Sequence, residues 1–274
     1  MKIKVIKSVD GERWYLDHLL HREGGPAVTR LDGTKEWYFK GKVHRVGGPA
    51  VEKVDGTKWW YFDGYCHRAD GPAVEYSNGE KEWRVKGKLH REDGPAIEYT
   101  KFKEWFFHGI PHRADGPARE YTDGKKEWWF DGKRHREDGP AIEFANGRKD
   151  WYIDGKRHRA DGPAIEFADG SKEWWFDGVH QRIGGPAIEC ANGLKEWYFL
   201  GVLHRIDGPA RELTSGTKEW WLEGRRHRSD GPAVIGSRGK REWWYRGRKI
   251  KSKKVVELLS KLEKLSDLLQ KIEV

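Results

Sequence analysis

A sequence period of 23 residues runs through almost the whole chain. Counted from the proline of each Gly-Pro-Ala, every step is 23 residues except one of 22, and the prolines are Pro26, Pro49, Pro72, Pro95, Pro117, Pro140, Pro163, Pro186, Pro209 and Pro232. In a chain with such a period each unit is stabilised mainly by its neighbours, so one central core is not expected. The period therefore outweighs the one or two globular domains that 274 residues would otherwise suggest.

Each repeat predicts two tight turns between short strands. In "PAIEFADGSKEWWFDG", the strand-like residues 165–167 lead to Asp169-Gly170, and the aromatic run 174–176 leads to a second glycine, Gly178. We expect type I′ hairpin turns, because Asn, Asp and Gly tolerate the positive φ that both central residues need. The 22-residue step falls in "EYTKFKEWFFHG", which lacks the first Asx-Gly pair and predicts an altered hairpin tip. His18 replaces the second glycine in the N-terminal partial unit, where we expect strain or fraying.

These features resemble the MORN repeat, the membrane occupation and recognition nexus unit. The resemblance lies in the 23-residue period and in an aromatic-x-x-Gly-Lys-x-His pattern such as "WWFDGKRH" at 128–135, and it covers nearly all of residues 1–250. It implies an all-β repeat, an elongated array of stacked antiparallel β-hairpins. The chain departs from the MORN pattern after the His, where Arg-x-Asp-Gly-Pro-Ala replaces a short Gly-x-Gly segment, so it is identified as a MORN-like variant. The expected domains are residues 1–250, with about ten units and an N-terminal partial unit, and residues 251–274, a C-terminal amphipathic helix.

Composition favours an ordered protein inside the cell. Hydrophobic residues make up 36% and charged residues 35%, but 16 Trp, 10 Tyr and 10 Phe supply large apolar surfaces that disordered chains lack. Cys66 and Cys190 stand at different repeat positions, so neither a disulfide framework nor a cysteine zinc site is indicated, and a reducing compartment fits best. The N-terminus has no apolar signal core, and no stretch approaches the ~20 apolar residues of a membrane span. We expect a cytoplasmic protein whose membrane contact, if it has one, is peripheral.

An arginine stands four residues before the proline in every repeat. The column comprises Arg22, Arg45, Arg68, Arg91, Arg113, Arg136, Arg159, Arg182, Arg205 and Arg228. The aspartate two residues before the proline is less regular, because Gly24, Gly47 and Gly184 replace it. Arginine must then have another partner, and the Glu column at 52, 75, 98, 120, 143, 166, 189 and 212 is a candidate. The favoured interpretation is a link between units; ligand binding is the alternative, with Arg136, Arg159, Arg182 and Arg205 as candidate binding residues.

A histidine column at 21, 44, 67, 90, 112, 135, 158, 204 and 227 raises the hypothesis of metal binding. Equivalent histidines would lie about 10 Å apart, whereas one zinc ion needs its nitrogen ligands at ~2 Å. We therefore expect structural histidines and neither a metal site nor a cofactor.

Two aromatic columns run side by side. The Trp column, at 14, 37, 60, 83, 105, 128, 151, 174, 197, 220 and 243, shares a strand face with residues two positions on, such as Phe39 and Phe176, and this face is predicted to be core. The next residue points the other way and is aromatic in every unit except at Arg84. Tyr152, Trp175, Tyr198 and Trp221 in this row are candidate binding residues, and stacking on a linear partner is one interpretation. Packing against the folded-back His-Arg segment of the same unit is the favoured one.

The tail "KSKKVVELLSKLEKLSDLLQKIEV" has no Gly or Pro and predicts an amphipathic helix. Val255, Leu258, Leu262, Leu265, Leu269 and Ile272 follow a heptad alternation. Three roles remain open: a cap on the last hairpin, a homodimer through a short coiled coil, or contact with a membrane surface.

The repeat favours a non-enzymatic scaffold or protein-interaction module. No Ser-His-Asp order, paired-carboxylate pocket or phosphate-binding glycine loop stands apart from the repeat, and catalysis needs a unique residue set. The partner expected first is another protein. The alternatives are anionic phospholipid headgroups, which the resemblance suggests and the net charge of +9 permits, or a nucleic acid or glycan along the aromatic row.

Overall fold

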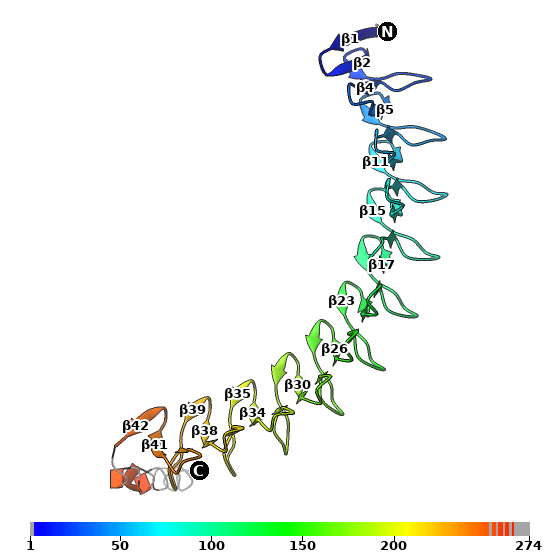
Figure 1. Cartoon of the computed structure of the whole chain (residues 1–274). Helices are drawn as coiled ribbons and strands as arrows, with labels where there is room; N and C mark the ends of the chain where they lie inside the picture. The colour runs from blue at the N-terminus through cyan, green and yellow to red at the C-terminus, as the bar shows by residue number, and fades with distance from the viewer. Residues whose placement is uncertain (1–2, 252–253, 256, 260, 263–264, 266–274) are drawn as a thin grey trace, which may run out of the picture. The chain divides into compact units, whose positions relative to one another are not determined.

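A series of short antiparallel strands makes up the protein. The computed structural model describes residues 3–251, 254–255, 257–259, 261–262 and 265. The chain divides into two compact units, Met1–Arg134 and His135–Val274, and within each unit hairpins follow one another in chain order (Figure 1). The predicted all-β repeat of successive hairpins is confirmed.

The strands of the first unit are β1 (Ile3–Ser8), β2 (Gly11–Leu16), β3 (Leu19–Leu20), β4 (Val28–Arg30), β5 (Lys35–Glu36), β6 (Tyr38–Phe39), β7 (Lys42–Val43), β8 (Val51–Glu52), β9 (Lys58–Trp59), β10 (Tyr61–Phe62), β11 (Tyr65–Cys66), β12 (Val74–Glu75), β13 (Lys81–Glu82), β14 (Arg84–Val85), β15 (Lys88–Leu89), β16 (Ile97–Glu98), β17 (Phe102–Glu104), β18 (Phe106–Phe107), β19 (Ile110–Pro111), β20 (Arg119–Tyr121), β21 (Lys126–Glu127), β22 (Trp129–Phe130) and β23 (Lys133–Arg134).

The strands of the second unit are β24 (Ile142–Glu143), β25 (Lys149–Asp150), β26 (Tyr152–Ile153), β27 (Lys156–Arg157), β28 (Ile165–Glu166), β29 (Lys172–Glu173), β30 (Trp175–Phe176), β31 (Val179–His180), β32 (Ile188–Glu189), β33 (Lys195–Glu196), β34 (Tyr198–Phe199), β35 (Val202–Leu203), β36 (Arg211–Glu212), β37 (Lys218–Glu219), β38 (Trp221–Leu222), β39 (Arg225–Arg226), β40 (Val234–Ile235), β41 (Arg241–Tyr245) and β42 (Arg248–Ile250).

Each repeat contains two hairpins with different neighbours. In the repeat that starts at Pro163, β28 pairs with β29 in the first hairpin, β28 also pairs with β25 of the preceding repeat, and β29 pairs with β32 of the next. The first hairpins thus form a continuous ladder within the unit. The second hairpin, β30 with β31, pairs only within itself in the described chain, and its Gly178 N–H donates to the Arg157 carbonyl of the preceding repeat.

The two turns of a repeat differ, which corrects the prediction that both are type I′. At the second turn, Asp177 and Gly178 have φ of 48° and 84°, as a two-residue type I′ turn requires. At the tip of the first hairpin, which the structure describes in full, Gly170 is the one residue with positive φ. The Phe167 N–H donates to the Ser171 carbonyl across this tip. This is the three-residue loop that places a left-handed glycine after a type I turn. Asp169 acts through its side chain, because Oδ1 accepts the Ser171 N–H at 2.9 Å.

Both predicted irregularities are found. In the short repeat the Tyr99 N–H donates to the Phe102 carbonyl, so two residues close the tip where three do elsewhere. His18 has a φ of 72°, and a non-glycine residue in this region is strained. The hairpin is nevertheless intact, with Tyr15 paired to Leu20, so the alternative expectation of fraying is wrong.

The core lies on a different face from the predicted one. The alanine of each Gly-Pro-Ala is 0% exposed, and Val74, Ile142 and Ile165 beside it are buried. Phe39 and Phe176, predicted to be core, are 43% and 45% exposed. The prediction failed because the chain leaves the main ladder at the Trp, so strand alternation does not carry across into the second hairpin.

The described residues of the tail are helical at 254–255, 257–259, 261–262 and 265. Leu258, Leu262 and Leu265 are 60%, 62% and 56% exposed, and Val255 is also exposed. Leu269 and Ile272 of the predicted heptad lie outside the described residues. Among the residues described, no helix has the length and apolar character needed to cross a membrane.

Candidate interaction surface

The arginine column stacks on the Trp column. The Arg159 guanidinium carbon lies 4.2 Å from the Trp151 ring centroid, and the Arg182 carbon lies 3.7 Å from that of Trp174. The same stack recurs at Arg22, Arg45, Arg68, Arg91, Arg113, Arg205 and Arg228, at 3.9–4.3 Å. A planar, delocalised cation on an indole face covers apolar surface that would otherwise face water. The Trp column is therefore half-buried beneath its own arginines.

Each arginine of the column also donates to the carbonyl of its proline, and all of them except Arg22 pair with one or two carboxylates in the described chain. Arg159 donates to Asp161 at 2.9 Å, to Glu166 at 2.9 Å and to the Pro163 carbonyl at 3.3 Å. Where glycine replaces the aspartate, Arg45 still donates to Glu52 at 2.9 Å and Arg182 to Glu189 at 2.7 Å. The predicted role of the Glu column is confirmed for every member except Glu212. Arg136, Arg159, Arg182 and Arg205 hold the repeat together, and whether they also bind a ligand stays a prediction.

The histidines form a ladder with exposed phenylalanines. The rings of His158 and Phe176 are 4.4 Å apart, and His44 lies 5.8 Å from Phe39 and 4.8 Å from Phe62. The Nδ1 of the histidine accepts a backbone N–H from the next repeat, as His44 does from Asp63 at 3.0 Å. The histidines thus have the structural role expected of them. Within the described residues, no group of three or more His, Cys, Asp or Glu is placed to hold a metal ion.

The row that follows each Trp points into a line of buried carboxylates that we did not predict. Glu127 and Asp150 are each 1% exposed, and the other buried members are Glu36, Glu82, Glu104, Glu196 and Glu219, while Glu173 and Glu242 at the same repeat position are half-buried. Trp175 Nε1 donates to Glu173 at 2.9 Å, and the Tyr198 hydroxyl donates to Glu196 at 3.1 Å. Trp129, Trp221, Trp244 and Tyr38 make the same bond.

This arrangement explains the one non-aromatic residue of the row, since Arg84 Nε donates to Glu82 at 2.7 Å. The candidate residues Trp175, Tyr198 and Trp221 are half-buried in this network, and Tyr152 is only 9% exposed. The favoured interpretation, packing within the repeat, agrees with these contacts. The carboxylates were missed because Glu before Trp looks like the polar side of an alternating strand.

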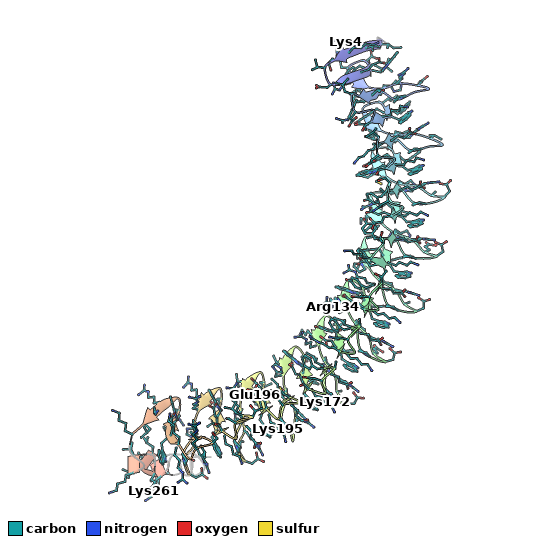
Figure 2. The ribbon with its side chains drawn as sticks, viewed as in Figure 1. Lys4, Arg134, Lys172, Lys195, Glu196 and Lys261 are labelled. Atoms are coloured by element: carbon teal, nitrogen blue, oxygen red, sulfur yellow. The ribbon has the colours of Figure 1, made fainter. Side chains whose placement is uncertain are left out.

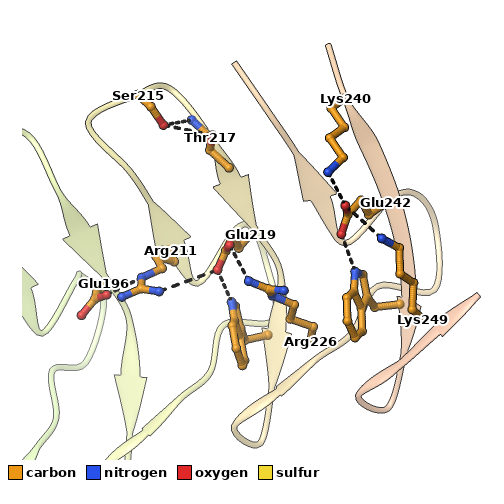
Figure 3. A network of polar contacts seen from close by, with 11 residues as sticks. Glu196, Arg211, Ser215, Thr217, Glu219, Arg226, Lys240, Glu242 and Lys249 are labelled. Carbon is orange, nitrogen blue, oxygen red and sulfur yellow. Dashed lines mark hydrogen bonds and ion pairs between the residues drawn. The ribbon is translucent and has the colours of Figure 1, made fainter. Parts of the chain in front are cut away.

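Each buried carboxylate has a cationic partner, but the partner comes from different repeat positions. Glu36 pairs with Arg30, Glu82 with Arg84, Glu104 with Arg119, Glu127 with Lys125 and Arg134, Asp150 with Arg148, Glu196 with Arg211, and Glu219 with Arg226. The half-buried Glu173 lies 3.1 Å from His180 Nε2 instead. Figure 3 shows Arg211 between Glu196 and Glu219, with Arg226 on the far side of Glu219. An unpaired buried carboxylate is strongly destabilising, so any position that reaches it can supply the cation.

One repeat lacks the carboxylate and, at three of these positions, the cation. Trp59 replaces the acid, and Tyr61, Cys66 and Val74 stand where other repeats place Arg84, Arg134 and Arg119. Burial raises the pKa of Cys66 to about 11, as expected of a thiol in an apolar site. Cys66 and Cys190 are both free thiols.

The pKa values of the buried acids move in opposite directions. Burial works to raise the pKa of Glu127, but hydrogen bonds from Lys125 and the charge of Arg134 outweigh it, and the pKa lies below its ordinary value. At Glu104 burial prevails over the Arg119 ion pair, and the pKa is raised. Burial also raises the pKa of Tyr198 to about 12, so its hydroxyl remains a donor to Glu196.

Clefts open between successive His-Arg-x-Asp-Gly-Pro loops. In the first unit a cleft of about 710 Å³ lies between loops 91–95 and 112–115, with Trp105 and Phe107 among its lining residues, and one of about 390 Å³ lies between loops 45–48 and 67–70. In the second unit clefts of about 680 Å³ and 730 Å³ lie between loops 136–140 and 158–161 and between loops 205–209 and 227–230. The same Trp, His and Arg positions of the repeat therefore line all four clefts.

The exposed charge at the mouths of two clefts is acidic. Asp93, Asp115 and Asp161 are each 84% exposed, whereas the arginines that they pair with are only 21–23% exposed and stack on Trp. Glu92 and Glu137 stand beside the aspartates on these rims. A partner entering these clefts meets carboxylates first and aromatic rings below.

One tryptophan in each cleft has an indole N–H group without a hydrogen-bond acceptor among the described residues. The indole N–H groups of Trp105 and Trp151 donate to no acceptor in the described part of the chain, and, unlike that of Trp59, they are not closed off from solvent. The same holds for Trp60 and Trp220 in the other two clefts. Each cleft thus contains an unused hydrogen-bond donor.

No protein-family model matches the chain, and no curated protein matches its sequence.

Proposed function

We propose that the protein is a non-enzymatic scaffold that binds another protein through its repeated clefts. The observation that carries the proposal is the recurrence of an open cleft with the same Trp, His, Arg and Asp lining in both units. Aromatic side chains beside a charged rim are the usual composition of protein-binding sites. A MORN-like array, with its hairpins as spacers for identical sites, fits this role.

The half-exposed phenylalanines are the residues to test. Phe62 and Phe107 each line a cleft, are 53% and 49% exposed and contact a histidine ring, so they are not required to fill the core. A variant with both changed to Ser is compared with the wild type in affinity capture from a lysate of source cells. Retained proteins, lipids and nucleic acids are all identified, and thermal unfolding of each variant confirms that it folds.

We expect proteins that the wild type retains and the Ser variant loses. The proposal fails if the folded variant retains the same set as the wild type. A control variant with Lys126, Lys149, Lys172 and Lys195 changed to Gln removes charge from the exposed lysine row without touching the phenylalanines. This variant should capture the same proteins.

Binding of anionic lipid headgroups is the second candidate, and the lysine row favours it. Every repeat has an exposed Lys or Arg at one strand position, at 35, 58, 81, 103, 126, 149, 172, 195, 218 and 241. Lys172 and Lys195 of this row are labelled in Figure 2. Binding that depends on this row would fall steeply with salt and be lost in the lysine variant, whereas cleft binding would survive both.

The exposed apolar residues of the tail are proposed to mediate contact with a second copy of the chain. Leu258, Leu262 and Leu265 are more than half exposed, which favours a homodimer over a cap. Sedimentation of the full chain and of a Leu258, Leu262 and Leu265 to Ser variant tests this, since loss of a dimer is expected in the variant. A wild type that is monomeric at all concentrations contradicts it.

A further inference from the structure

The clefts of each unit recur at a step set by the strand ladder. Each repeat adds two strands to the ladder, as β28 and β29 do between β25 and β32. Adjacent strands lie about 4.7–4.9 Å apart, so each repeat advances the ladder by roughly 9.4–9.8 Å. The two clefts described in the first unit stand two such steps apart, and the two in the second unit stand three steps apart. A partner that enters both clefts of a unit must present equivalent side chains at these multiples of the step.

Among the regular backbone conformations, polyproline II fits the step best. It has three residues per turn and rises about 3.1 Å per residue, so every third residue lies on one face at intervals of about 9.3 Å. An extended strand returns to the same face every ~6.7 Å, so it differs from the two-step spacing by about 1 Å and from the three-step spacing by about 2 Å. An α-helix returns after seven residues, about 10.5 Å, and the excess of roughly 1 Å accumulates at each repeat.

The chemistry of the clefts matches this conformation. A polyproline II backbone has no internal hydrogen bonds, so its carbonyls need external donors. The solvent-facing indole N–H groups of Trp60, Trp105, Trp151 and Trp220 are such donors, one in each cleft. Aromatic rings such as Phe107 give prolyl rings a flat apolar surface, and the exposed Asp93, Asp115 and Asp161 attract basic side chains at the rim.

We infer that the clefts bind a proline-rich, lysine- or arginine-containing polypeptide segment in the polyproline II conformation, one turn to each repeat. The inference rests on the proposed function and names its partner by conformation and charge. A segment of about 12–15 residues would span the clefts of one unit. Its stiffness lowers the conformational entropy lost on binding, which favours it over a flexible chain of equal charge.

The test is a calorimetric titration of the full chain with synthetic peptides of about 18 residues, long enough to fill one unit. The probe is a repeat of Pro-Pro-Lys. A Gly-Ser-Lys repeat matches its length and charge without the conformation, a Pro-Pro-Glu repeat reverses the charge, and a lysine-containing amphipathic peptide supplies a helix. We expect the Pro-Pro-Lys peptide to bind about tenfold or more tightly than the Gly-Ser-Lys peptide at equal ionic strength.

Two sets of Trp to Phe substitutions place the binding. Changing Trp60, Trp105, Trp151 and Trp220 to Phe keeps a ring under each arginine but removes the cleft donors, and should weaken binding about five- to tenfold. The control changes Trp129, Trp175 and Trp244, which line none of the four described clefts, to Phe. Their N–H groups donate to Glu127, Glu173 and Glu242, so this variant should be less stable but bind the peptide unchanged.

Equal affinity for the Pro-Pro-Lys and Gly-Ser-Lys peptides in the wild type overturns the inference, and this comparison needs no variant to fold. Tighter binding of the helical peptide also overturns it. If the Pro-Pro-Lys peptide shows no preferential binding but the phenylalanine variant still loses proteins from the lysate, this inference is refuted and the proposed function is not. If the variant loses none, the proposed function falls as well.

Discussion

The line of buried carboxylates predicts a destabilisation that a second substitution should repair. Glu196 is 5% exposed and its cation is Arg211, whose repeat position carries Ile165 and Ile188 in the two preceding repeats. Changing Arg211 to Ile therefore introduces the residue normal for that position but leaves Glu196 without its guanidinium. Removing one partner of a buried ion pair costs about 3–5 kcal/mol. Because Arg211 is 36% exposed and Tyr198 still donates to Glu196, we expect about 2–3 kcal/mol.

Leu203→Arg is the repair. Leu203 is paired with Tyr198 as Arg157 is with Tyr152, and in that repeat Arg157 lies 3.9 Å from the buried Asp150. An arginine at 203 should therefore reach Glu196 from the second hairpin. We expect the double variant to recover most of the stability that Arg211→Ile loses.

The assay is hydrogen exchange followed by mass spectrometry, because a repeat array need not unfold in one step. A local loss of 2–3 kcal/mol corresponds to about 30- to 150-fold faster exchange in β33 and β36. Lys218→Ile, an exposed position of the next strand, serves as the control and should change stability by less than about 0.5 kcal/mol. The reasoning is refuted if Arg211→Ile alone leaves exchange unchanged, or if Leu203→Arg fails to slow it again.

Four further substitutions test other parts of the repeat. His18→Gly relieves a φ of 72° and should raise the stability of the N-terminal hairpin by about 0.5–1 kcal/mol, measured by local hydrogen exchange; a loss would contradict the strain. Glu127→Gln should destabilise the protein at pH 7. The pKa of Glu127 is lower in the folded protein than in the unfolded chain, so its charged form stabilises the fold above the unfolded pKa of about 4.5. This stability is lost as pH falls through the folded-state pKa. Glu104→Gln should be neutral or stabilising at pH 7, because the raised pKa of Glu104 means that folding disfavours its charged form. Urea unfolding between pH 3 and pH 7 compares the Glu127 and Glu104 variants, and equal losses of stability in both would refute the predicted difference. Arg182→Lys should lower the urea midpoint by the equivalent of about 1–2 kcal/mol, because an ammonium cannot both cover the Trp174 ring and reach Glu189, and an unchanged midpoint would show the stack to be dispensable.

The period, the hairpins and the Arg–Glu link could be predicted because each depends on residues close together in one repeat. The Glu column needed only the observation that Arg45 and Arg182 persist where their aspartate is missing. The turn at Gly170 was mistaken because Asp-Gly is compatible with both a type I′ turn and a left-handed glycine after a type I turn, and only the loop length separates them. The buried carboxylates could not be read from one repeat, since their partners come from four or more positions. Comparing repeats with one another did contain a signal: Trp59 replaces the acid where Cys66 and Val74 replace the cations.

The division between fixed and variable positions bears on how such clefts could choose a partner. The alanine of Gly-Pro-Ala, the arginine stacked on Trp and the histidine are repeated because each contacts a neighbouring repeat. A substitution at one of these positions therefore affects two repeats. The residue between Arg and Asp has no such contact to preserve, and it varies: Glu92 and Glu137 on two rims, Ile206 on a third, where it is 87% exposed. A partner that follows the clefts of a unit therefore meets the same Trp in each interior and a changing rim. The interior would supply affinity for any chain of the right conformation, and the order of acidic and apolar rims would decide which sequence of basic and apolar side chains binds best.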